Sequence, residues 1–353
     1  MINNIQRRRF LITGAMTGAA GLLLSGSRTA RGQNAPIIGA GTLFVALRMK
    51  LWLAEAPATP GLTIGYEPIG AGRGLNKLLR GDADFAATDL PTPDQKLAEA
   101  NLLQIPLGKG GLAIVVNVAG ITANQIQLNG ELLAGIYSGA IKNWNDPKIA
   151  AVNPSLKLPD LDIRPLHVGD PSGSLYTMTY HFTQYLLATN ADWRAKYGAA
   201  ITKRWAVGSM VPDLNNMGDN IRTIPGSIGY MPIGRARADQ HTTVKLKNAD
   251  GVVIAPSGAA VKAAAVRAAD AEKGGAFPTS LVNLPGAESW PIVIPSFALI
   301  PRTPKDPARG DAVLAFFRYV VGNGEGVSTQ TDCAHLTKAQ QGVALQLLNK
   351  TTG

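Results

Sequence analysis

The sequence predicts an α/β fold in which ligands bind at the carboxyl ends of strands. Short apolar segments typical of strands alternate along the chain with segments of helical periodicity, and this alternation is characteristic of α/β proteins. About 320 residues remain after an N-terminal leader, which exceeds one compact core and indicates two domains. Because no low-complexity linker separates them, we expect the strands themselves to form a hinge, with a ligand cleft between two lobes.

The leader, residues 1–32, is typical of a twin-arginine export signal. Three arginines at 7–9 precede a weakly apolar run at 12–24. This run is shorter than the roughly 20 apolar residues of a membrane-spanning helix. We therefore expect cleavage after Gly32 and a soluble periplasmic protein. The single cysteine, Cys333, lies near the other end, so neither lipidation nor an intrachain disulfide is expected.

Charge and composition favour an anionic ligand and exclude some other partners. Removing residues 1–32 removes five arginines and no acid, which lowers the formal net charge from +10 to +5. The remaining basic residues are scattered and are not interleaved with aromatic residues, so no nucleic acid is expected as a partner. A mildly basic surface attracts anions. The four histidines are also scattered, and we expect no metal and no cofactor.

The individual elements follow from the periodicity of apolar residues and from the residues that flank each segment. The expected strands are 63–67, 84–88, 111–118, 163–168, 227–231 and 292–300. The expected helices are 44–56, 74–79, 93–100, 130–137, 176–188, 259–271 and 311–321.

An anion cradle is predicted between the strand at 163–168 and the helix that starts near 176. The connecting segment reads Asp-Pro-Ser-Gly-Ser at 170–174. Free backbone N–H groups and the helix dipole favour negative charge at a helix start. Gly173 allows close backbone approach, and Ser172 and Ser174 add hydroxyl donors. An isolated match of this kind also describes an ordinary helix cap with a flexible turn.

Two glycine-rich turns, at 39–44 and 70–74, have the same layout of strand, glycines and helix. The amides of the first turn are suited to form a nest around an anion. The second turn adds Arg73, whose guanidinium can pair with an oxyanion. Ordinary turns and a solvated arginine are the alternative interpretations.

Asp89 ends the strand at 84–88 and is a candidate sensor of a protonated anion. A carboxylate repels an anion unless that anion donates a proton to it. Monohydrogen phosphate can do so near neutral pH, whereas sulfate cannot. The alternative is a turn or cap residue ahead of Pro91.

These segments together resemble the periplasmic phosphate-binding proteins of high-affinity phosphate ABC transporters. The resemblance runs from about residue 38 to residue 324, and its most specific motif is Ile-Tyr-Ser-Gly-Ala-Ile-Lys-Asn-Trp-Asn-Asp-Pro at 136–147. It is supported by the motifs at 39–41, 81–91, 104–117, 225–230 and 290–292. The resemblance implies a two-lobed type II periplasmic-binding-protein fold, with residues 33–117 plus 296–353 in lobe I and 118–295 in lobe II. It further implies a monomer that is not an enzyme and that delivers phosphate or a related oxyanion to a membrane ABC permease.

The family's ligand residues carry over in part. Asp89 matches its phosphate-sensing aspartate, Ser172, Gly173 and Ser174 match its anion loop, and the backbone amide of Phe44 matches an anion donor. Three side-chain contacts are missing, because Leu43, Ala71 and Val168 replace a threonine, a serine and an arginine. Thr42 and Arg73 are candidates to compensate. The expected ligand-binding residues are Thr42, Leu43, Phe44, Ala71, Gly72, Arg73, Asp89, Ser172, Gly173 and Ser174.

The three missing contacts leave the preferred ligand open. Each hydrogen bond to a charged group contributes on the order of 1.5–3 kcal/mol, so losing three without replacement would weaken binding by several powers of ten. One alternative is a binding protein for a phosphonate, phosphate ester or carboxylate, with Leu43, Ala71 and Val168 around its organic part. Two others are a secreted phosphatase-like protein with Ser172 or Ser174 as nucleophile, and a signalling protein on the same fold.

Overall fold

The computed structural model describes residues 36–60, 63–169, 177–197, 205–271 and 280–349. The expected export signal and the expected anion loop at 170–174 lie outside these residues. No helix in the described ranges is both long enough and apolar enough to cross a bilayer.

The sheet of lobe I has the strand order β2-β1-β3-β13-β4. Its strands are β1 (Ile37–Gly41), β2 (Ile64–Glu67), β3 (Phe85–Thr88), β4 (Leu102–Val116) and β13 (Ile292–Pro301). β1 is parallel to both β2 and β3, whereas β13 runs antiparallel to β3 and β4. Because β1 and β3 are parallel neighbours, their carboxyl ends lie at the same edge of the sheet.

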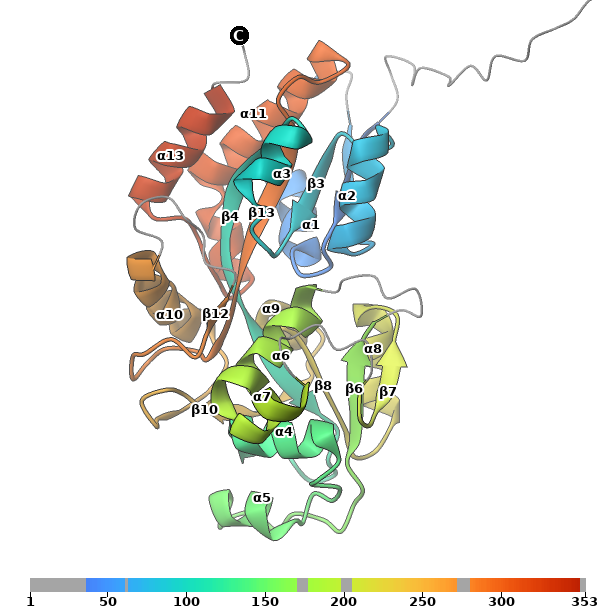
Figure 1. Ribbon diagram of the computed structural model, residues 1–353, viewed down its shortest axis with the longest axis vertical. Helices are drawn as coiled ribbons and strands as arrows, with labels where there is room; N and C mark the ends of the chain where they lie inside the picture. Colours follow the sequence, from blue (N-terminus) through green and yellow to red (C-terminus); the bar gives the residue numbers. More distant parts are fainter. Residues whose placement is uncertain (1–35, 61–62, 170–176, 198–204, 272–279, 350–353) are drawn as a thin grey trace, which may run out of the picture. The chain divides into compact units, whose positions relative to one another are not determined.

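The sheet of lobe II repeats this arrangement around the second half of β4. Its order is β7-β6-β8-β4-β9, with β6 (Arg164–Val168), β7 (Ser209–Val211), β8 (Ser227–Pro232) and β9 (Thr242–Thr243). β6 is parallel to β7 and β8, and β4 is antiparallel to β8 and β9. Both sheets therefore contain three parallel strands followed by one antiparallel strand. β4 belongs to both sheets, and Figure 1 shows it running from one into the other.

β4 begins nine residues before the strand predicted at 111–118. Pro106 and several glycines made residues 102–110 unlike a strand, because these residue types disfavour strand interiors. In the structure this segment lies between β13 and β14 (Cys333–Ala334), where small residues are required. A Cβ on Gly108, whose φ is +99°, would lie 2.5 Å from the carbonyl oxygen of Ala334.

The expected helices are present, with ends that differ by up to four residues. α11 (Pro307–Asn323) begins four residues earlier than expected, because Asp306 caps it by accepting from the Arg309 amide and Pro307 stands in its first turn. The other expected helices are α1 (Ala46–Glu55), α2 (Ala71–Arg80), α3 (Asp94–Glu99), α4 (Gly130–Ser138), α6 (Thr177–Thr189) and α10 (Gly258–Ala271). Helices that the sequence did not predict are α5 (Pro147–Val152), α7 (Ala191–Tyr197), α8 (Leu214–Thr223), α9 (Ile233–Ala238), α12 (Glu325–Gln330) and α13 (Lys338–Asn349).

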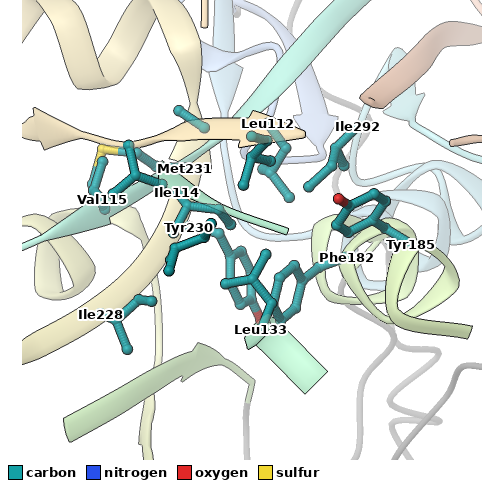
Figure 2. Packing of buried hydrophobic residues seen from close by; sticks show 14 of the residues in the cluster. Leu112, Ile114, Val115, Leu133, Phe182, Tyr185, Ile228, Tyr230, Met231 and Ile292 are labelled. Carbon is teal, nitrogen blue, oxygen red and sulfur yellow. The ribbon is translucent and has the colours of Figure 1, made fainter. Parts of the chain in front are cut away.

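Each lobe has its own apolar core. In lobe I, Trp52, Phe85 and Phe317 are fully buried among residues of β1, β3 and α11. In lobe II, Phe182 of α6 stacks on Tyr230 of β8, with ring centroids 4.6 Å apart. Figure 2 shows this pair among the apolar side chains of β4, α4, α6 and β8. α6 is thus anchored to lobe II by its buried face.

The N-terminus of α2 packs closely on the end of β1. A Cβ on Gly74 would lie 2.4 Å from the Cα of Gly41 and 2.5 Å from the carbonyl oxygen of Ala40. We expect Gly74→Ala to push α2 away from β1 and to lower the free energy of unfolding by about 1–3 kcal/mol, measured by urea denaturation. Gly322→Ala is the control, because a Cβ there meets no atom within 4 Å. Equal effects of the two substitutions would contradict this close packing.

Candidate functional site

The site is built where the carboxyl ends of β1 and β3 meet. Thr42 follows β1, and Asp89 follows β3. The register pairs Gly41 with Ala87, and the Thr42 amide donates to the Ala87 carbonyl at 3.0 Å. The sheet thus brings together two of the residues that the sequence singled out.

Asp89 is completely buried and accepts three side-chain hydrogen bonds. Its Oδ2 accepts from the Thr42 hydroxyl and, at 2.6 Å, from Thr177 of α6. Its Oδ1 accepts from Ser296 of β13 at 3.1 Å. Ser296 reaches Asp89 because β13 is the antiparallel neighbour of β3, with an irregularity between Ser296 and Phe297. Three hydroxyl groups from distant parts of the chain therefore converge on one carboxylate.

Burial raises the pKa of Asp89 to about 6, because a dry environment disfavours the charged form. Hydrogen bonds from Thr177, Thr42 and Ser296 and the positive charge of Arg48 oppose this rise. Asp89 is thus ionised and acts only as an acceptor above about pH 6. Below that pH it becomes protonated and can donate.

α6 contacts Asp89 a second time through His181. The Nε2 of this buried histidine lies 2.9 Å from the backbone oxygen of Asp89. Burial lowers the pKa of His181 to about 4, so the ring is neutral near pH 7 and Nε2 carries the proton that it donates to the carbonyl. A helix of lobe II thereby binds a residue of lobe I at both its carboxylate and its main chain.

The loop after β1 is ordered by hydrogen bonds around Thr42. The Phe44 amide, an expected anion donor, donates to the Thr42 hydroxyl at 3.1 Å. The Tyr66 hydroxyl donates to the Thr42 carbonyl at 2.8 Å. The Thr42 hydroxyl also lies 3.5 Å from that of Thr177. Thr42 thus connects the Phe44 amide with the Asp89 carboxylate.

The second glycine-rich turn adjoins this loop, since the Gly70 amide donates to the Gly41 carbonyl at 2.8 Å. Ala71 is buried and Gly72 is partly buried, both in the first turn of α2, where backbone amides lack helical partners. Arg73 is exposed, and its Nε donates to the Ile69 carbonyl at 2.6 Å. A role for Arg73 in binding an anion stays a prediction.

Leu43 and Val168, two of the three residues that replace family contacts, contribute to packing. Both are buried in the core of lobe II, with 7% and 1% of their surface exposed. Ser172, Gly173 and Ser174 lie outside the described residues, so their contribution also stays a prediction. The described part of the chain contains no cluster of three or more histidine, cysteine or acidic residues that could hold a metal ion.

Four residues around Asp89 were missed by the sequence analysis: Arg48, Thr177, His181 and Ser296. Two of them left a signal in the sequence. Arg48 is a charged residue on an apolar helix stripe between Phe44 and Trp52, and Ser296 is a polar residue inside an apolar strand. Thr177 and His181 lie on a helix whose buried face was recognised only as apolar.

The repeated strand order and the β4 strand shared by both sheets define the class of this protein. It is a two-lobed binding protein with the type II periplasmic fold. A family model described as a PBP superfamily domain matches residues 25–323. A solved structure of a high-affinity periplasmic phosphate-binding protein (PfluDING) bound with phosphate superposes with a TM-score of 0.66 at 20% identity, covering 88% of this chain and 92% of that one. That likeness supports the fold.

Two curated relatives are more similar in sequence. The phosphate-binding protein PstS of Xylella fastidiosa (strain Temecula1) is 34% identical over 293 residues, which cover 83% of this chain and 79% of that protein. The phosphate-binding protein PstS of Haemophilus influenzae is 33% identical over 296 residues, which cover 84% and 87%. The chain belongs to the PstS family of phosphate-binding proteins.

Proposed function

We propose that this protein captures inorganic phosphate in the periplasm and delivers it to a membrane ABC permease. The observation that carries the proposal is the fully buried Asp89, which accepts hydrogen bonds from hydroxyl groups of both lobes. The membership of the PstS family supports the same ligand.

The chemistry of Asp89 favours a protonated oxyanion. Above about pH 6 its carboxylate is ionised and can only accept. Monohydrogen phosphate brings a P–OH donor to this acceptor, whereas sulfate would place one negative oxygen against another without a proton between them. Dry surroundings strengthen both the attraction and the repulsion. Asp89 thus provides selectivity at the same point where it provides binding.

The hydroxyl groups that converge on Asp89 support the idea that lost family contacts are compensated. The Thr42 hydroxyl lies one residue before Leu43, which stands where the family has a threonine. Thr177 adds a hydroxyl from α6, the helix that the expected anion loop precedes. We propose that phosphate engages both hydroxyls together with the amides of Phe44, Gly72 and the loop at 172–174. The relatives, which are named for phosphate, do not favour an organic anion.

The remaining features of the proposal concern export and organisation. We propose that residues 1–32 direct export by the twin-arginine route and are removed, and that the protein acts unlipidated, as a monomer and not as an enzyme. We further propose that lobe I comprises 33–117 plus 296–353 and lobe II comprises 118–295. The change of partner of β4, from β13 up to Gly111 to β8 from Leu112, supports a hinge in this strand.

Isothermal titration tests the proposed function. The mature protein is freed of bound anion by unfolding and refolding and is titrated with phosphate at pH 7.5, alone and in excess sulfate. We expect a dissociation constant in the micromolar range or tighter, about −8 kcal/mol or better, that sulfate leaves unchanged. The absence of phosphate binding by a protein with the circular dichroism of a folded α/β domain would overturn the proposal. Methylphosphonate in the same assay tests an organic anion.

A further inference from the structure

Arg48 is an unusual residue because its side chain is buried in the interior of lobe I. Only 2% of its surface is exposed. The guanidinium carbon lies 5.8 Å from the centre of the Phe44 ring and 5.5 Å from that of the Trp52 ring. These two aromatic residues, four positions before and after Arg48 on the same stripe of α1, stabilise the cation through their ring faces.

The charge of Arg48 has little direct compensation. Among the described residues, no carboxylate lies within ion-pair distance of its guanidinium. Its Nη1 donates to the Leu107 carbonyl at 3.4 Å and its Nη2 to the Ser296 hydroxyl at 3.1 Å, while its buried Nε has no partner among the described residues. Burying a charge in this way is costly unless another charge nearby benefits from it.

The Ser296 hydroxyl links Arg48 to Asp89. A hydroxyl group has one hydrogen to donate and lone pairs to accept with. Because Ser296 accepts from Arg48, its hydrogen is free to point toward Oδ1 of Asp89, which lies 3.1 Å away. Arg48 therefore fixes the direction of the Ser296 hydroxyl, and the order of donation runs from Arg48 through Ser296 to Asp89.

We infer that Arg48 is a positioning residue that acts through Ser296 to hold Asp89 in its ionised, accepting form and so sets the selectivity for protonated over unprotonated oxyanions. This inference rests on the proposed function and names the source of its selectivity. It also assigns a new role to a positive charge in a chain in which Val168 replaces the family's arginine. Arg48 supports the acceptor from behind instead of contacting the ligand.

The other titratable groups around this relay are neutral or lie outside it. Tyr66 of β2 faces Asp89, and burial raises its pKa, so it stays protonated. His181 of α6 is neutral, as argued above. His335 faces Arg48, and burial together with the arginine's charge lowers its pKa, which keeps it uncharged near neutral pH. Lys109 of β4 is buried as well, but Arg48 is the cation that acts on the pKa of Asp89.

The test compares Arg48→Met, which keeps the apolar stem, with Arg48→Lys, Ser296→Ala and the control Arg80→Met. Arg80 is 60% exposed, so its substitution removes one positive charge from the surface. Competition of sulfate with phosphate is measured by titration from pH 5 to 8. In the wild type we expect sulfate to begin to compete as the pH falls through about 6, where Asp89 gains its proton.

We expect Arg48→Met to move this midpoint upward by about one pH unit, and to lower the preference for phosphate over sulfate at pH 7 about tenfold. Ser296→Ala should move the midpoint in the same direction without changing any charge. Arg48→Lys should restore most of the wild-type midpoint, and Arg80→Met should leave it unchanged. A wild-type midpoint in folded Arg48→Met and Ser296→Ala proteins would overturn the inference and leave the proposed function standing.

A second measurement does not depend on phosphate. The carboxyl ¹³C resonance of Asp89 is assigned by its absence in Asp89→Asn and followed as a function of pH in the ligand-free protein. An upward shift of its pKa in Arg48→Met is the expected result, and an unchanged pKa overturns the inference even if the wild type binds no phosphate. If Arg48→Met does not fold, the titration of Ser296→Ala decides in the same way.

Discussion

Asp89→Asn is expected to let sulfate compete with phosphate, lowering the preference for phosphate about 10- to 100-fold at pH 7.5. The wild-type carboxylate is buried and ionised at this pH, so it accepts from a P–OH group and repels an unprotonated oxyanion. A carboxamide has nearly the same shape but also carries an N–H donor, which suits sulfate. The expected factor corresponds to one hydrogen bond to a charged group, about 1.5–3 kcal/mol. Titration calorimetry of both anions measures it.

The pH dependence provides a sharper form of this test. In the wild type, sulfate should be excluded above about pH 6 and admitted as Asp89 becomes protonated below it. In Asp89→Asn, sulfate binding should show no such transition near pH 6. The control is Asp82→Asn, which removes the charge of a side chain that is 53% exposed. If Asp89→Asn still excludes sulfate as the wild type does, Asp89 is not the group that senses the proton.

Arg309→Met is expected to lower the free energy of unfolding by about 3–5 kcal/mol, because it leaves a buried carboxylate without its partner. The Arg309 Nε donates to Oδ1 of Asp84 at 2.9 Å, and its Nη2 donates to Oδ2 at 2.7 Å. Side-chain exposure is 6% for Arg309 and 17% for Asp84. Oδ2 also accepts from the Ile38 amide at 2.7 Å, and Nη2 donates to the Pro36 carbonyl at 2.9 Å. The pair thus joins α11 to the beginnings of β1 and β3.

Urea denaturation at pH 7 measures this loss, and two variants make the result specific. Arg80→Met breaks an ion pair whose side chains are 60% and 53% exposed, and should cost less than about 1 kcal/mol. The double variant Asp84→Asn/Arg309→Met should cost less than the sum of the single substitutions, because neither leaves a bare buried charge. Strict additivity would show that the two side chains do not act as a pair.

Much of the fold could be predicted because its signals are local. The alternation of strands and helices is determined by apolar periodicity within each segment. The start of β4 could not be predicted, because Pro106 and Gly108 disfavour a strand locally and become suitable only where β13 and β14 pack against them. The start of α11 was also missed, although Asp306 and Pro307 are a readable start signal.

The sequence by itself determined the fold class, the resemblance to phosphate-binding proteins and the position of Asp89 at the end of a strand, because each depends on residues that are neighbours along the chain. Only the tertiary structure showed what surrounds that carboxylate. Arg48, Thr177 and Ser296 come from α1, α6 and β13, and lie up to 248 positions apart. No local pattern marks such a cluster, since its members meet only after β13 pairs with β3 and α6 reaches across to lobe I. The protonation of Asp89, and with it the proposed selectivity, depends on that meeting.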